Sequence, residues 1–300
     1  MLSNAGLVKA DIALIDSTVL NARIAYPNDI TLLFKALKKM HNLLHKQQIA
    51  SDWNHDELKK RWRSFNLERK NATHLVWLEE FYGYFSQGLR QIQGMGLDNP
   101  AFEILNQQTQ LKLKGETQIA ERLVSLDDLD ARPIVKGKKR PKCEFGTSLQ
   151  MGFNRQGFLI TTEILIGQPC DSARYLPLLE EFKDRLGSYP KKVVTDLGYR
   201  SDENRRLTPD AVKKVFLGKS SDVSKKDLKS CRSARSATEG FIAAAKSQYG
   251  FGQSRYWGVI GHRIWSKLSQ VGYNLRKMMQ LYRADKLSEK VQFKLGLLSG

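Results

Sequence analysis

The first apolar segment of the chain is short and ends in a carboxylate. Residues 10–18 read ADIALIDST, an apolar run of strand length that reaches Asp16. This pattern predicts a buried strand with Asp16 at its carboxyl end. After a break, apolar residues recur at helical spacing over 30–44, and Asn28 or Asp29 is placed to cap the first turn. A helix is therefore expected to follow the strand.

Helical patterning continues to about residue 118 with few β-branched runs, which predicts an all-α block. Beyond residue 129 the pattern changes to the period of strands. Two alternating runs, 143–153 and 157–167, are joined by residues 154–157, which read NRQG. They predict a β-hairpin.

The rest of the chain alternates between strand and helix patterns. Helices are predicted over 171–186, 234–250 and 260–281, and short buried strands over 191–196, which ends in Asp196, and 211–218. Strands connected by helices indicate an α/β domain built on a mixed sheet. The helical block is then inserted after its first strand.

The net charge of the chain indicates what kind of partner it binds. Its 300 residues carry 49 Lys and Arg against 31 Asp and Glu, a formal net charge of +18. Such a field attracts polyanions, so nucleic acid is the first candidate partner, ahead of a ribosome-associated enzyme or a peripheral membrane protein. The chain has no membrane-spanning run or leader pattern, and three widely spaced cysteines indicate no disulfide framework. A cytoplasmic protein is expected.

Two predicted strands end in aspartate, Asp16 and Asp196. Ligands collect at the carboxyl ends of strands in open α/β sheets. Aspartates at strand ends are also common as turn and cap residues. Two carboxylates at one interior edge repel each other unless a cation neutralises them, so the pair points to a hard divalent cation.

A third carboxylate, Glu239, has two interpretations. In the segment RSATEGFIAAAK, residues Arg235, Glu239, Ile242 and Lys246 follow at offsets of four, three and four, which places them on one helix face. The same segment contains Ser236-Ala-Thr-Glu239, the pattern of a capping box that merely begins a helix. Both interpretations are kept at this point.

Four passages carry a resemblance to a known family. They begin at residues 16, 131, 193 and 235 and read DSTVLNARIAYPND, ARPIVKGKKRPKCEFG, VVTDLGYRSDEN and RSATEGFIAAAKSQYGFGQSRYWGVIGH. The chain resembles the DDE transposases of bacterial insertion sequences, in the RNase H-like (retroviral integrase) superfamily. The family signature is Tyr, two residues, Arg, three residues, Glu, six residues, Lys. Arg235, Glu239 and Lys246 satisfy it, and Arg232 occupies the position of the tyrosine.

The resemblance implies a fold and a division of the chain. The fold would be an RNase H-like mixed five-stranded sheet flanked by helices, with an all-α insertion after the first strand. The catalytic core would comprise residues 1–27 and 130–285, the insertion residues 28–129 and a C-terminal tail residues 286–300.

The resemblance also implies an activity, which is metal-dependent DNA strand cleavage followed by strand transfer. Asp16, Asp196 and Glu239 would be the catalytic residues and the ligands of two Mg²⁺ ions, for which Mn²⁺ would substitute. Two such ions stabilise the attacking and leaving oxygens of a phosphodiester, and Mg²⁺ prefers oxygen ligands. The partners would be double-stranded DNA, as element ends and target, and a second copy of the chain on that DNA, associated with the nucleoid.

Several basic residues are candidates for DNA contact. Arg235 and Lys246 could meet phosphates near the site, or could lie on a solvated helix face. A basic loop after residue 131 is the best candidate for backbone binding, although such loops are often only solubilising. The candidate loop residues are Lys136, Lys138, Lys139, Arg140 and Lys142.

Aromatic and imidazole side chains between residues 41 and 65 are weaker candidates. Trp62 and Phe65 could stack on bases, but their spacing is more often that of a core. His41 and His45 lack a metal-binding partner pattern and are expected on the surface of the first long helix.

One departure from the family leaves two alternatives open. Members generally carry a helical DNA-binding segment ahead of the first aspartate, whereas this chain reaches Asp16 almost at once. This departure motivates the first alternative, a truncated, inactive remnant that binds DNA. The second, a simple RNase H-like nuclease, would share the catalytic ions.

Overall fold

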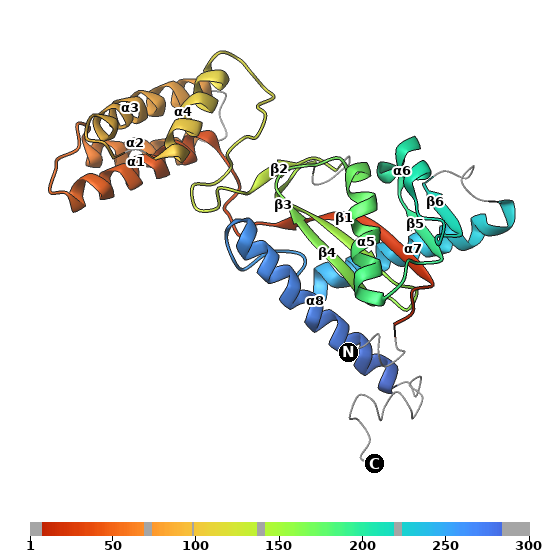
Figure 1. Ribbon diagram of the computed structural model, residues 1–300. Helices are drawn as coiled ribbons and strands as arrows, with labels where there is room; N and C mark the ends of the chain where they lie inside the picture. The colour runs from red at the N-terminus through yellow and green to blue at the C-terminus, as the bar shows by residue number, and fades with distance from the viewer. Residues whose placement is uncertain (1–7, 69–73, 98, 137–141, 219–223, 284–300) are drawn as a thin grey trace. The chain divides into compact units, whose positions relative to one another are not determined.

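The computed structural model describes residues 8–68, 74–97, 99–136, 142–218 and 224–283 (Figure 1). The chain divides into two compact units, one formed by residues 24–133 and the other by the segments before and after them. The sequence analysis placed the helical block at 28–129. The predicted tail, 286–300, lies outside the described residues.

The first unit is helical. Its first helix begins where the sequence predicts, because the Asn28 side chain accepts a hydrogen bond from the Thr31 backbone N–H at 3.2 Å and caps the first turn. Phe65 is buried in the core of this unit and the half-buried Trp62 packs against that core, which confirms the core interpretation of the pair. The helices are α1 (Asp29–Lys46), α2 (His55–Glu68), α3 (His74–Gly94) and α4 (Pro100–Leu113).

The second unit is built on a six-stranded mixed sheet with the order β2-β3-β1-β5-β6, and β4 pairs with β3. The β1–β3 and β3–β4 pairs are antiparallel, whereas β1–β5 and β5–β6 are parallel. The strands are β1 (Ile12–Asn21), β2 (Arg132–Ile134), β3 (Glu144–Phe153), β4 (Leu159–Leu165), β5 (Lys192–Thr195) and β6 (Lys214–Leu217). The α/β class, the β3–β4 hairpin and both later strands agree with the sequence analysis.

Helices cover both faces of this sheet, and α5 and α7 lie on opposite faces (Figure 1). Ala13 and Ile15 of β1 pack with α5, whereas Leu14 and its neighbour Val194 pack with α7. β1 is therefore buried on both sides, which explains its continuous apolar run. The helical elements are η1 (Asp171–Arg174), α5 (Tyr175–Leu186), η2 (Leu197–Tyr199), α6 (Asp202–Leu207), α7 (Lys225–Gln248) and α8 (Gly258–Arg283).

Three sequence predictions about these elements are wrong in detail. The sheet has six strands rather than five among the described residues, because residues 132–134 of the predicted basic loop form β2. β1 continues to Asn21, held by its pairing with β3, so Asp16 lies in the middle of the strand and not at its end. α7 begins at Lys225 rather than near residue 234, because the Ser224 side chain caps it by accepting from the Asp227 N–H.

Candidate functional site

The pairing of β1 with β5 brings Asp16 and Asp196 to neighbouring positions. The register aligns Leu14 with Val194, and each aspartate follows two residues later, Asp16 within β1 and Asp196 directly after the last residue of β5. Because side chains alternate along a strand, each aspartate shares the sheet face of the aligned residue before it. That face is the one covered by α7. The carboxyl end of β5 therefore lies level with the middle of β1, where the two aspartates meet.

α7 adds Glu239 and Arg235 to the same place. A small pocket of about 10 Å³, roughly the room for one water molecule, is lined by residues of β1, β5, the turn after β5, and α7. Glu239 is exposed at its rim, and Arg235 is half-buried. The lining residues are Ile15, Asp16, Val194, Thr195, Asp196, Arg235, Thr238 and Glu239.

The capping-box interpretation of Glu239 is wrong. α7 begins at Lys225 with Ser224 as its cap, so Ser236 and Glu239 lie in the middle of a 24-residue helix. No free backbone N–H groups remain there for a capping side chain to satisfy. The Glu239 side chain is therefore available to the pocket.

The two aspartates share an unfavourable environment for negative charge. Burial, and then the charge of Asp196, raise the pKa of Asp16 from 3.8 to about 6, although the Ser17 N–H and Lys136 oppose the shift. Burial also raises the pKa of Asp196, helped by the charge of Asp171 and opposed by the Gly198 N–H. Groups held against their charged form in a pocket are typical of sites that bind a cation.

A further carboxylate, Asp171, was missed by the sequence analysis. It opens η1, where its Oδ2 accepts from the Ser17 hydroxyl at 2.9 Å and its Oδ1 accepts from the Gln150 amide at 2.7 Å. Its charge raises the pKa of Asp16 and of Asp196. In the sequence it has the form of an ordinary first-turn acid, so no local signal could have linked it to the site.

Lys136 lies closer to the carboxylates than the basic-loop interpretation suggested. Its Nζ donates to the Ser17 hydroxyl at 2.7 Å, and its charge lowers the pKa of both Asp16 and Asp196. Of the other loop candidates, Lys142 is exposed. Lys138, Lys139 and Arg140 lie outside the described residues.

Lys246 is engaged within the protein. Its Nζ pairs with the Glu144 carboxylate at 3.2 Å and lies 3.4 Å from the Thr18 hydroxyl, and both lysine and glutamate side chains are largely buried. Thr18 lies two residues beyond Asp16 on the same face of β1. Lys246 therefore ties α7 to β1 and β3 beside the carboxylates.

The histidines of α1 and α2 belong to the helical unit. The His41 ring stacks on His55 at 4.0 Å between centroids, and the residue is half-buried with its Nδ1 shielded, so it is less exposed than the surface position that the sequence predicts. His45 is exposed.

The oxygen donors of this site are those that a hard divalent cation binds, but they do not form a complete set of ligands. Within the described ranges, no three His, Cys, Asp or Glu side chains are grouped so that they could hold a metal ion. The carboxylate oxygens of Asp16 and Asp196, held side by side, are nonetheless the donors that Mg²⁺ prefers, and this ion keeps several waters. Asp16 and Asp196 could therefore bind an ion together with water molecules. Glu239 would have to turn into the pocket to become a third protein ligand.

The raised pKa of Asp16 predicts a pH-dependent stability. In a metal-free buffer containing chelator, the folded state binds the Asp16 proton more tightly than the unfolded state does. The stability gained from that proton is complete below about pH 4 and is lost as pH rises through about 6. From about pH 4 to 7.5, the wild type should lose about 3 kcal/mol relative to Asp16→Asn. Urea unfolding of both proteins measures this, and parallel pH profiles would contradict it.

In the described part of the chain, no helix has both the length and the apolar character needed to cross a bilayer. Comparison of this sequence and structure with protein-family models, with curated proteins and with solved structures gives no match.

Proposed function

We propose that this chain cleaves DNA phosphodiesters with the help of divalent metal ions and joins the freed strand to a second DNA, as a DDE transposase does. The observation that carries the proposal is the pair of Asp16 and Asp196, aligned by the β1–β5 register and lining one pocket with Glu239. The raised pKa values of both aspartates support it, because a bound cation would relieve the repulsion that burial imposes.

The role of each residue follows from its position. Asp16 and Asp196 would hold the metal, and Glu239 would hold a second ion. Such ions supply a water activated for attack and stabilise charge on the phosphodiester oxygens. Arg235, which lines the same pocket, would bind a phosphate oxygen of the substrate. Lys136, through Ser17, would orient the strand segment that carries Asp16.

Topology and charge support the same proposal. An RNase H-like core requires a mixed sheet with a central strand between an antiparallel and a parallel neighbour, and β1 lies between β3 and β5 in this way. Four helices follow β1 in the chain before β2 begins, in the place of a helical insertion. The net charge of +18 suits a polyanionic substrate. A transposase also has to pair two DNA ends, so we expect two copies of the chain on the DNA.

A second candidate, an inactive DNA-binding remnant, is favoured by one observation. Among the residues described, no three metal-ligating side chains are grouped, and Glu239 is exposed at the rim. A remnant would keep the basic surface and its affinity for DNA, and would bind no catalytic ion.

The test is the conversion of supercoiled plasmid to nicked circles by the purified protein with Mg²⁺, with Mn²⁺ or with EDTA. We expect nicking with either ion and none with EDTA. Joining of a labelled 3′-hydroxyl oligonucleotide to the plasmid would distinguish a transposase from a simple nuclease. Plasmid that is bound but left intact in both ions would favour the remnant.

A further inference from the structure

The end of the sheet at which its parallel strands begin, opposite to the carboxylates, is rich in cations. The parallel strands β1, β5 and β6 begin side by side, because Ile12 is aligned with Lys192, and Lys192 with Lys214. The backbone N–H of Lys191 also donates to the Ala10 carbonyl at 3.3 Å. We call this surface the basic edge. It consists of Lys9, Lys191, Lys192, Lys213 and Lys214, together with Arg155 from the turn between β3 and β4.

The acids at this edge do not cancel its charge. Asp11 uses its Oδ1 to accept from the Ile12 N–H at 2.9 Å. Asp227 is paired with Lys214 at 2.9 Å. Asp210 lies close by, since its carbonyl accepts from the Lys213 Nζ at 2.8 Å. Among the described residues of this surface, six cations stand against three carboxylates, which leaves a positive balance.

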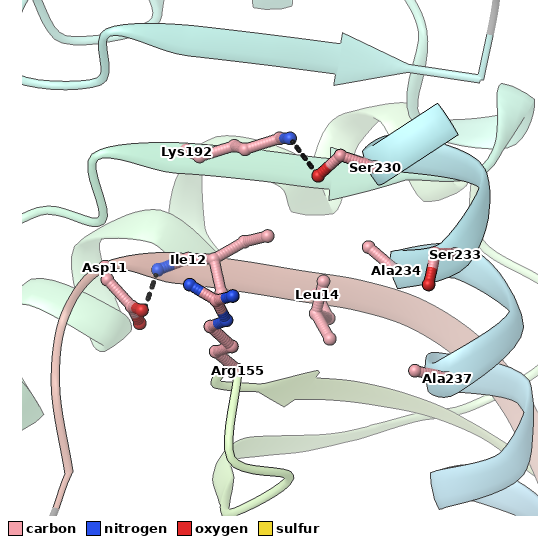
Figure 2. A pocket seen from close by; sticks show the side chains of 9 residues that line it. All are labelled: Asp11, Ile12, Leu14, Arg155, Lys192, Ser230, Ser233, Ala234 and Ala237. Carbon is pink, nitrogen blue, oxygen red and sulfur yellow. Dashed lines mark hydrogen bonds between the residues drawn. The ribbon is translucent and has the colours of Figure 1, made fainter. Parts of the chain in front are cut away.

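A cavity of about 390 Å³ opens into the basic edge (Figure 2). Its floor is the apolar start of β1, and its wall is the small-residue flank of α7. It is lined by Asp11, Ile12, Leu14, Arg155, Lys192, Ser230, Ser233, Ala234 and Ala237.

Apart from the Asp11 carboxylate, whose Oδ1 accepts from the Ile12 N–H, the polar groups of this cavity are those that bind phosphate. The Lys192 Nζ donates to the Ser230 hydroxyl at 3.2 Å, which holds both groups at the rim. Ser233 presents another hydroxyl from the next turn of α7, and Figure 2 shows the Arg155 guanidinium rising from the opposite side. A planar guanidinium, an ammonium group and hydroxyls together can surround the oxygens of a phosphate ester. The apolar floor can accommodate the attached sugar.

This cavity is separate from the carboxylate pocket. On α7, Ser230, Ser233 and Ala237 lie on one flank, whereas Arg235 and Glu239 lie on the other, as the helical period requires. Along β1, four residues separate Ile12 from Asp16, about 13 Å at the rise of a strand. A phosphate in the cavity would therefore not be the reacting phosphate.

We infer that the basic edge binds the phosphate backbone of DNA away from the reacting phosphodiester, with one phosphate and its sugar seated in the cavity between Arg155 and Lys192. The choice of DNA as the polyanion rests on the proposed function, in which DNA is the substrate. The binding itself requires neither metal ions nor the carboxylates.

The test is the salt dependence of binding to a fluorescein-labelled 20-base-pair duplex in EDTA. Each phosphate contact contributes about 0.9 to the slope of log K against log salt concentration. Because the two side chains would share one phosphate, Arg155→Gln with Lys192→Gln should reduce the slope by about 0.9. The matched control, Arg263→Gln with Arg276→Gln, removes the same charge from exposed positions of α8 and should leave the slope nearly unchanged. Equal changes in both variants would overturn the inference.

A second variant tests the cavity without altering charge. Ser233→Phe places a ring at its mouth from an exposed helix position and should also weaken duplex binding. Competition with 5′-dTMP and with inorganic phosphate separates a DNA site from a site for a small phosphate ester. If either small anion binds the wild type and not the double variant, while both proteins bind the duplex equally, the DNA assignment is wrong.

These outcomes are independent of the nicking experiment. A protein that never nicks DNA can still lose slope on removal of Arg155 and Lys192, which would support the inference and count against the proposed activity. A protein that nicks DNA and keeps its slope would do the reverse.

Discussion

Replacing Asp196 with Asn should abolish the metal-dependent nicking of DNA, with a fall in rate of about a thousandfold or more. Asp196 lies beside Asp16 at the end of β5, and a neutral amide there removes half of the negative charge that would hold the ion between them. Stabilisation by such an ion is worth several kcal/mol in the transition state, and each 1.36 kcal/mol is a factor of ten in rate.

The substitution should leave the fold intact. The Asp196 Oδ1 accepts a hydrogen bond from the Gly198 N–H at 3.0 Å, and the amide oxygen of Asn can accept the same bond. Removing a buried charge whose pKa is raised is expected to stabilise the protein in the absence of metal. DNA affinity in EDTA should be kept or slightly increased.

The matched control is Asp184→Asn, which removes the same charge from an exposed position of α5. Plasmid nicking, urea unfolding and duplex binding are measured for both variants. The proposal fails if Asp196→Asn nicks DNA at the rate of Asp184→Asn.

Adding a single methyl group at Gly218 should displace the backbone at Asp196 and so disturb the carboxylate pocket. Gly218 follows β6 and has a φ of +78°, and a Cβ there would lie 2.4 Å from the Leu197 backbone nitrogen and 2.7 Å from the Asp196 carbonyl carbon. We expect Gly218→Ala to cost about 3 kcal/mol, from the left-handed backbone and from the clash. It should also lower the nicking rate strongly, because relief of the clash moves Asp196.

Gly187→Ala separates these two causes. Gly187 has nearly the same φ, +79°, but nothing lies within 4 Å of the added Cβ. Its substitution should cost about 1 kcal/mol and leave nicking unchanged. Urea unfolding and plasmid nicking of the pair measure the difference. Equal losses of stability and activity in the two variants would show that the contact with the Asp196 turn is unimportant.

The parts of the fold that local patterns control could be predicted from the sequence. The cap at Asn28, the hairpin of β3 and β4 and the short strand before Asp196 depend on residues close together in the chain. The expectation that Asp16 and Asp196 meet also needed only one assumption, that their two strands are parallel neighbours.

Features that depend on distant partners could not be predicted in this way. β1 extends to Asn21 because β3, more than a hundred residues later, continues to pair with it. Asp171 of η1 is linked to the carboxylate site by hydrogen bonds with Ser17 of β1 and Gln150 of β3. Lys246 has the sequence position of a phosphate ligand, yet Glu144 engages it. Each case depends on tertiary pairing, which local periodicity does not encode.

The register of β1 has a consequence for how the two aspartates respond to a ligand. Asp16 is paired at the backbone with Met151 of β3 and lies within a ladder that continues on both sides of it. Asp196 lies beyond the last residue of β5, on a turn that leads into η2. The backbone at Asp16 is thus held in place by the sheet, whereas the backbone at Asp196 can move with its turn. Differences in ionic radius, such as those between Mg²⁺ and Mn²⁺, would be absorbed by the turn and not by the sheet.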